Sequence, residues 1–288
     1  MKICILGPKK TGESEIKLIE EAKNIFEKVL YVPISNVRIE CTGKKPAPYY
    51  KDTNLLEFDV FLPRIFKKAS DMGYVLMKTL EGDMKYSPLN HRSVLFGYNE
   101  FLLPMQLREN GIPSLKSYFA MSRLALEKTI SDLKYPIVLK LPYDKKGEII
   151  IDSEETAKGV FDAVEELSQP LLVQDFAGKA DSIDALVAGK KIFALKNKKL
   201  PARLSKIETK TILRASKAIN ASVSEINCLR TEEGLLVHGA NICPNLTKYE
   251  PEFGPVSREV LRHLHAAAAV HYEFGVIKFL KWFERGMP

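Results

Sequence analysis

A lysine at the end of an apolar run is the first residue here whose chemistry calls for a partner. Lys140 follows Ile137-Val138-Leu139 in a segment predicted to be a buried strand. A buried ammonium without a counter-anion is costly, so an anionic ligand is one explanation for it. The other is a strand-end lysine whose amine reaches solvent. Lys145 and Lys146 follow in a turn with one glycine, and a solvated hairpin turn is the ordinary interpretation of that segment.

Several polar side chains lie on two consecutive predicted strands near the C-terminal end of the sequence. Glu225 and Asn227 are two residues apart on a predicted strand, so they share one face. Asn241 lies on the strand that follows. A solvent-facing glutamate is the simpler interpretation of Glu225. By strand alternation, His238 is expected on the face opposite Asn241, and no histidine pair has metal-ligand spacing.

The composition predicts a globular protein in a reducing compartment. The 288 residues are 45% hydrophobic and 27% charged, which excludes disordered, collagen-like and disulfide-scaffold classes. No run approaches eighteen apolar residues, so no membrane span is expected. The four cysteines lie far apart without CxxC spacing, and we expect a cytoplasmic protein.

The net charge of +7 favours anionic partners but does not choose among them. Nucleotides and other anionic small molecules satisfy it. The basic stretch over residues 190–217 contains only one aromatic residue, Phe193, to stack on bases, so nucleic acid is not the expected partner. A solvated lysine-rich segment explains it better.

Three units are predicted from the order of elements. Residues 1–90 alternate strand, helix and strand, which indicates a parallel sheet, with Ser14 as the expected helix N-cap. Residues 91–178 hold helices and strands joined by the lysine turn. Residues 179–288 begin with a hairpin whose turn is Gly189-Lys190 and end in a long helical region over residues 257–284.

Several phrases resemble, in order, those of the ATP-grasp superfamily, and within it the RimK-like α-L-glutamate ligases. They are Asp59–Ile65, Leu107–Pro113, Pro136–Lys140, Leu172–Phe176, Ile226–Arg230 and Gly239–Asn245. The resemblance covers nearly the whole chain. It implies an α/β protein (α+β subdomains) with an ATP-grasp fold that is preceded in the sequence by a parallel-sheet pre-ATP-grasp domain. The activity it implies is an ATP- and Mg²⁺-dependent ligation, in which a carboxylate becomes an acyl phosphate that an amine attacks.

The resemblance also implies roles for the residues at matching positions. The phosphates would meet Lys140, Lys145 and Lys146. The nucleotide would lie against the hinge of Gln174, Asp175, Phe176 and Ala177. Asn241 would hold nucleotide and metal, with Asn227 as a further metal candidate. Glu225 is a metal candidate only because it shares the strand face of Asn227.

The chain departs from the family pattern at charged positions that contact ATP or the metal in the family. Glu100 stands where the family has its first ATP-contacting lysine, and Asp184 where it has an arginine. Its two metal carboxylates fall on Asn227 and Gly239. An amide and a hydrogen atom are poor ligands for Mg²⁺.

Two functions therefore stay open. One is an ATP-dependent carboxylate–amine (glutamate) ligase, with these replacements arguing against catalysis. The alternative is a non-catalytic ATP-grasp homologue that binds a nucleotide or another anion weakly, or acts as a partner subunit. A protein partner or a second copy of the chain belongs to that alternative.

Overall fold

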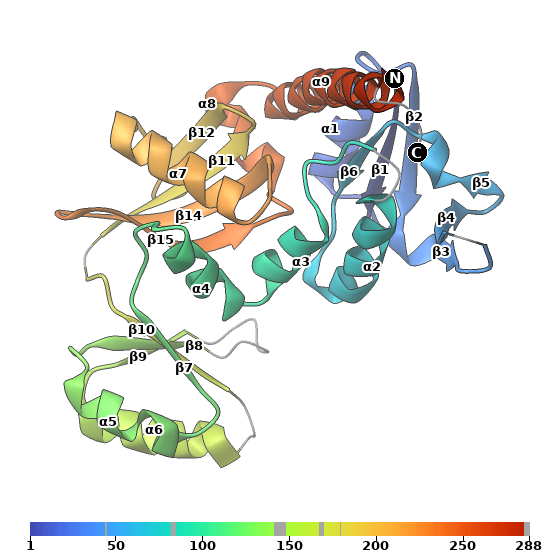
Figure 1. The fold of residues 1–288 in the computed structure, drawn as a ribbon. Coiled ribbons are helices and arrows are strands. Elements are labelled where there is room, and N and C mark those ends of the chain that lie inside the picture. Colours follow the sequence, from blue (N-terminus) through green and yellow to red (C-terminus); the bar gives the residue numbers. More distant parts are fainter. Residues whose placement is uncertain (44, 82–84, 141–147, 167–169, 179, 285–288) are drawn as a thin grey trace.

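The computed structural model describes residues 1–43, 45–81, 85–140, 148–166, 170–178 and 180–284, with side chains described as far as Glu273. The described strands form four sheets. Figure 1 shows the N-terminal sheet and the largest sheet flanking helices α2 to α4, while a smaller α/β unit lies at one end of the molecule.

The N-terminal unit is built on a parallel three-stranded sheet in the order β2-β1-β6, as the strand–helix alternation predicted. Its elements are β1 (Lys2–Gly7), α1 (Glu13–Ala22), β2 (Lys28–Pro33) and β6 (Val60–Pro63). The apolar run Ile3–Leu6 is fully buried, which explains why this strand lies in the centre. Helix α1 has Gly12 at its N-cap, so the expected N-cap role of Ser14 is wrong.

The segment between β2 and β6 forms an antiparallel sheet that the sequence analysis did not predict. It contains β3 (Val37–Glu40), β4 (Ala47–Tyr50) and β5 (Thr53–Asn54). Three helices then lead to the middle unit: α2 (Ser70–Glu81), α3 (His91–Tyr98) and α4 (Leu102–Glu109). Helix α3 was also not predicted. It begins with a capping box in which Asn90 and Ser93 exchange side chain–backbone hydrogen bonds.

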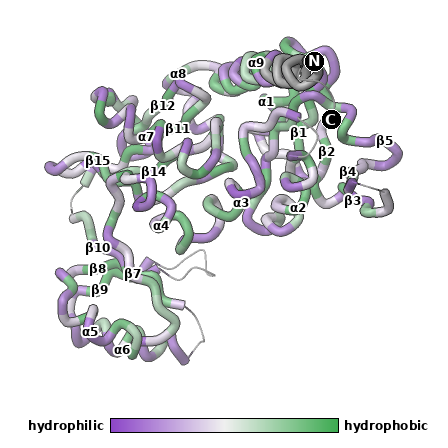
Figure 2. Tube along the Cα trace, viewed as in Figure 1, coloured by the Kyte–Doolittle hydropathy of each residue, from purple (hydrophilic) through white to green (hydrophobic). Residues whose placement is uncertain are grey.

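The middle unit is an antiparallel sheet in the order β7-β10-β8-β9, with two helices packed on one face. Its elements are β7 (Ser117–Ala120), α5 (Arg123–Asp132), β8 (Ile137–Lys140), β9 (Glu148–Ile151), α6 (Glu154–Glu166) and β10 (Leu171–Asp175). Figure 2 shows hydrophobic residues along these strands. Among the described residues, they form a core with α5 and α6 that contains only residues of this unit.

The C-terminal unit is an antiparallel sheet in the order β13-β12-β11-β14-β15, with a helical tail. Its elements are β11 (Asp181–Ala188), β12 (Lys191–Lys196), β13 (Leu200–Pro201), α7 (Lys206–Ala218), β14 (Val223–Thr231), β15 (Gly234–Asn241), the 3-10 turn η4 (Leu246–Lys248), α8 (Glu250–Phe253) and α9 (Val256–Glu284). Helix α9 returns to the N-terminal unit, where the Arg258 guanidinium donates to the Glu21 carboxylate over 2.8 and 3.0 Å.

The N-terminal and C-terminal units share their hydrophobic cores. One core joins Leu6 of β1 to Ile226 of β14, and the other joins Ile5 to Leu186 of β11 and to Val260 of α9. The division at residues 90 and 178 therefore remains a proposal about the chain. No described helix has an apolar stretch long enough for a bilayer crossing.

Candidate functional site

A cavity of about 250 Å³ lies between helix α4, the middle sheet and the end of strands β14 and β15. It brings together Lys140, Gln174 and Asn227, three of the residues that the sequence analysis selected. Its wall is completed by Phe96, Gly97, Asn99, Glu100, Leu103, Pro104, Glu148, Leu172, His238, Gly239 and Ala240. The described wall does not include Asp175, Phe176, Ala177 or Asn241. Lys145 and Lys146 lie outside the described residues.

Lys140 at the end of β8 is the ammonium of this cavity. Its Nζ lies 3.2 Å from a carboxylate oxygen of Glu148, its register partner on β9. The lysine side chain is 14% exposed, whereas the glutamate is 67% exposed. Because the carboxylate is largely in solvent, it screens the lysine only in part. Lys140 therefore remains a cation that faces the cavity.

Gln174 on β10 contributes a buried acceptor to the same wall. Its Nε2 donates to Ser117 Oγ over 2.8 Å. Its Oε1 is buried and accepts no hydrogen bond from the part of the chain that the structure describes. A buried acceptor without a donor is unfavourable by about 1–3 kcal/mol. Gln174 lines the cavity, while this oxygen itself is closed off from solvent.

His238 reaches this cavity because strand β15 contains a bulge. Asn227 pairs with Gly239 and Cys228 pairs with Val237, so His238 is the extra residue. The expectation that alternation turns His238 away from the site is therefore wrong. Burial first, and then the positive charge of Lys140, lower the pKa of His238 to about 4.

A network of charges lies beside the cavity, on strands β11 and β14 and on the turn η4. The Lys248 ammonium donates to Asp184 Oδ2 over 2.5 Å and to Glu225 Oε2 over 3.2 Å. Asn227 Nδ2 donates to the other oxygens, Asp184 Oδ1 at 2.9 Å and Glu225 Oε1 at 3.2 Å. Glu225 shares a face with Asn227 as predicted, but it is buried, so its interpretation as solvent-facing is wrong.

Neither Lys248 nor its pairing with Asp184 was predicted. The two residues are 64 positions apart, and only the fold brings them together. The one available signal was the acidic residue at position 184, because a carboxylate on an apolar strand needs a counter-charge.

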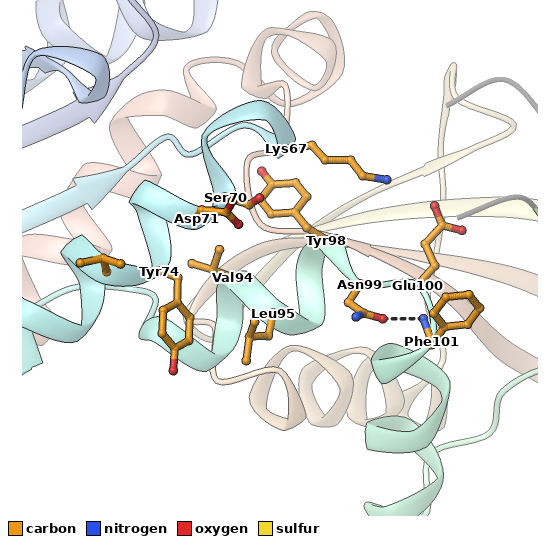
Figure 3. A pocket seen from close by; sticks show the side chains of 11 residues that line it. Lys67, Ser70, Asp71, Tyr74, Val94, Leu95, Tyr98, Asn99, Glu100 and Phe101 are labelled. Carbon is orange, nitrogen blue, oxygen red and sulfur yellow. Dashed lines mark hydrogen bonds between the residues drawn. The ribbon is translucent and has the colours of Figure 1, made fainter. Parts of the chain in front are cut away.

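A larger cavity of about 660 Å³ lies next to the first one, between α2, α3 and the start of α4. Figure 3 shows Tyr74, Leu95 and Tyr98 along its wall, with Lys67 and Glu100 extending toward the same side. Glu100 and Asn99 line both cavities. The exposed carboxylate of Glu100 is thus an anion at the point where the two meet.

Comparison with known proteins identifies the family. A RimK PreATP-grasp domain model matches residues 1–93, and a RimK-like ATP-grasp domain model matches residues 99–260. The chain belongs to the RimK-like ATP-grasp family. A probable alpha-L-glutamate ligase from Picosynechococcus is 25% identical over 93% of this chain and 97% of its own length. One from Aliivibrio fischeri is 26% identical over 88% of this chain and 91% of its own length.

Solved structures confirm the predicted ATP-grasp fold. A RimK domain ATP-grasp protein from Sphaerobacter thermophilus has a TM-score of 0.73 at 17% identity and covers 91% of this chain and 99% of its own. The Bacillus anthracis D-alanine–D-alanine ligase complexed with ATP has a TM-score of 0.63 at 15% identity and covers 95% of this chain and 98% of its own. The Microcystis aeruginosa macrocyclase MdnC, bound with the precursor peptide MdnA, has a TM-score of 0.70 at 16% identity, covering 92% of this chain and 99% of its own.

The ATP-grasp family generally uses ATP and Mg²⁺. The side chains at the corresponding positions of this chain do not fit Mg²⁺. Mg²⁺ requires oxygen ligands in octahedral geometry. The amide of Asn227 presents N–H groups to the two carboxylates, and Asn241 Oδ1 accepts from the Cys243 N–H over 2.9 Å. Among the described residues there is no cluster of three or more His, Cys, Asp or Glu side chains that could hold a metal ion.

Proposed function

We propose that this RimK-like ATP-grasp protein binds a nucleotide in the 250 Å³ cavity without a divalent-metal bridge and does not carry out the ligase reaction. The observation that supports this most strongly is the pairing of Asn227 with Gly239 in the β14–β15 ladder. These are the positions on which the two metal carboxylates of the family fall. An amide facing a glycine leaves the phosphates without the anionic groups that would attach Mg²⁺ to the protein.

The support for a nucleotide comes from two groups on the cavity wall. Lys140 supplies a cation suited to a phosphate. Gln174 on the cavity wall has an amide oxygen without a hydrogen-bond donor among the described residues, and we assign it to an exocyclic amine of the base, toward which the side chain has to turn. Leu103 and Leu172 line the cavity with apolar surface, as a planar base requires. A structural neighbour of the same fold is described as complexed with ATP.

Calorimetry with ATP tests this proposal. We expect a dissociation constant above about 10 μM, equivalent to roughly 7 kcal/mol or less of binding free energy. It should change less than twofold between excess Mg²⁺ and EDTA. Tight binding in Mg²⁺ that disappears with EDTA would contradict the proposal, because the metal would then be bridging protein and phosphates.

Matched lysine variants locate the binding site. Lys140→Ala should weaken ATP binding by about 1.5–3 kcal/mol, the range for a hydrogen bond to a charged group. Lys210→Ala removes an exposed lysine from helix α7 and should change binding little, because that charge is screened by solvent. Equal losses in the two variants would indicate a diffuse basic surface instead of the cavity.

The active ligase remains the second candidate because relatives matched along nearly their whole length are named probable alpha-L-glutamate ligases. Its signature is phosphate release from ATP that depends on both Mg²⁺ and glutamate. We expect none above the background of a Lys140→Ala preparation. Release that requires both additions, and that this variant lacks, would favour the ligase.

The proposal also covers partners and compartment. A structural neighbour holds a precursor peptide, and we propose that a protein partner or a second copy of this chain uses the larger cavity beside the nucleotide. The four cysteine thiols are all free, which supports a reducing compartment such as the cytoplasm.

A further inference from the structure

The Lys248 ammonium lies between two buried carboxylates. Lys248 Nζ is 2.5 Å from Asp184 Oδ2 and 3.2 Å from Glu225 Oε2. The side chains of these two acids are 7% and 10% exposed. Two buried carboxylates this close to one another require a positive charge, because each would otherwise repel the other in a poorly solvated environment.

Neighbouring donors engage the remaining oxygens of the two acids. Asn227 Nδ2 donates to Asp184 Oδ1 and to Glu225 Oε1. The Tyr249 hydroxyl donates to Glu225 Oε2 over 2.5 Å. Burial, together with the Glu225 carboxylate, raises the pKa of Tyr249 well above its usual value, so the phenol keeps its proton and remains a donor. Every carboxylate oxygen of this pair therefore faces an N–H or an O–H.

Lys248 is held in place by the chain on both sides. It ends the turn η4 (Leu246–Lys248). The Leu246 N–H donates to Ser14 Oγ over 3.0 Å, and the following Tyr249 is fully buried. The ammonium also lies 5.2 Å from the centre of the Tyr249 ring. The turn that carries Lys248 is therefore anchored on one side by Ser14 and on the other by the buried Tyr249.

We infer that Lys248 is the built-in counter-cation of this site, and that Asp184 and Glu225 form a cation site that opens when its ammonium is removed. The inference rests on the proposed function in one respect: it explains why nucleotide binding needs no divalent metal. Its own test contains no nucleotide, so failure of either proposal can be distinguished from failure of the other.

Terbium luminescence provides the test. Tb³⁺ prefers carboxylate oxygens, and a nearby tyrosine transfers excitation to it, so Tyr249 serves as the internal sensitiser. In the wild type we expect no saturable Tb³⁺ luminescence that depends on Glu225, so the Glu225→Gln variant should give the same signal as the wild type. Lys248→Met, which keeps the length of the side chain without its charge, should gain one saturable site at least tenfold tighter than any in the wild type. Ca²⁺ or Mn²⁺ should displace the Tb³⁺.

Three further variants separate this site from general effects of charge. Lys248→Arg keeps a cation and should bind Tb³⁺ like the wild type. Lys248→Met combined with Glu225→Gln should lose the gained site. Lys196→Met removes an ammonium 2.7 Å from the Asp181 carboxylate of the same sheet, but both side chains are 39% exposed, so no site should appear.

The inference is overturned by a Glu225-dependent Tb³⁺ site in the wild type, or by a folded Lys248→Met variant that gains none. If Lys248→Met melts at a lower temperature than the wild type, Ca²⁺ should raise its melting temperature and leave the wild type unchanged. A destabilised variant that Ca²⁺ does not stabilise shows that Lys248 serves only as a structural ion-pair partner.

Discussion

His238 illustrates how the charges of the cleft set the protonation state of a single side chain. The β15 bulge places it on the cavity wall with Lys140, and both burial and that ammonium oppose a second positive charge. At neutral pH the imidazole is therefore uncharged. Lys140 is left as the cation to which we assign an anionic ligand.

This depressed pKa predicts a loss of stability in mild acid. The unfolded histidine takes up a proton near its ordinary pKa of about 6.5, whereas the folded one does so only near a pKa of about 4. As the pH falls from 7 to 5, the unfolded state gains protons first, so His238 should lower the free energy of unfolding by about 1–2 kcal/mol. Urea denaturation at several pH values measures this dependence.

The comparison variants are His238→Gln and His265→Gln. The first should reduce the dependence between pH 7 and 5, leaving the smaller part that comes from His263, whose pKa is also lowered by burial. The second, on α9, should keep it because His238 is still present. If His238→Gln keeps the wild-type slope, acid sensitivity comes from other groups.

At the scale of secondary structure, the pairing of strands β14 and β15 determines which side chains meet. Asn227 lies directly opposite Gly239, and an added Cβ at Gly239 would come within 3.2 Å of Asn227 Oδ1. That contact is tight, but the atom it meets is the end of a side chain that can rotate. The added Cβ would also lie 3.3 Å from Asn227 Cβ, so a larger residue at position 239 requires a shift of Asn227 by a few tenths of an ångström.

Restoring both carboxylates should restore dependence on metal. Asn227→Asp with Gly239→Glu should give an ATP-induced rise in melting temperature that requires Mg²⁺, whereas each single change should do little. The coupling between the changes arises because they would share one ion. Thermal shift with ATP, with and without Mg²⁺, measures the effect.

Asn227→Asp with Gly239→Gln is the matched control, since it adds the same bulk with one carboxylate fewer. A Mg²⁺-dependent shift in the wild type as large as in the repaired variant would show that the native site already holds the metal.

Elements with strong periodicity could be predicted from the sequence, whereas elements set by tertiary contacts could not. The apolar run that ends at Leu139 identified a buried strand, and the turn at Gly189-Lys190 identified the β11–β12 hairpin. Helix α3 is only eight residues long, and its N-cap Asn90 was interpreted as the end of a unit. The small β3–β5 sheet lies in a polar, proline-containing segment whose pattern favours a loop.

The candidate site was predictable only in part, for a related reason. Lys140, Gln174 and Asn227 lie on strands whose order could be inferred, and they line one cavity. His238 was placed by assuming that side chains alternate regularly along the strand, and the bulge at this residue interrupts that alternation. Lys248 contacts Glu225 because the turn that carries it packs against the N-terminal unit. A tertiary contact of this kind cannot be inferred from spacing along the sequence.

At the scale of the whole molecule, the N-terminal unit holds the turn that carries Lys248. Ser14 Oγ donates to Asn245 Oδ1 over 2.8 Å and accepts from the Leu246 N–H over 3.0 Å. Ser14 and Leu246 are both buried at this junction. Two segments more than 200 residues apart are thereby joined beside the charged network.

Ser14→Ala should destabilise the protein by about 1–3 kcal/mol, because the buried Leu246 N–H would lose its acceptor. Chemical denaturation measures the loss. Ser131→Ala removes an exposed hydroxyl that is 3.3 Å from Glu154, and it should change stability by less than about 0.5 kcal/mol. Similar losses in both variants would show that the junction contributes no more than a surface contact.

The Lys248 ammonium is covalently part of the chain, whereas a metal ion would have to bind from solution. Each folded molecule carries one Lys248, so the position between Asp184 and Glu225 is occupied by a cation in every molecule, whatever the ion concentrations in solution. Chelators cannot withdraw it, and changes in the free magnesium of the cell cannot alter its stoichiometry. It also cannot leave with a ligand, so a nucleotide bound as we propose would dissociate without changing the charge of this site.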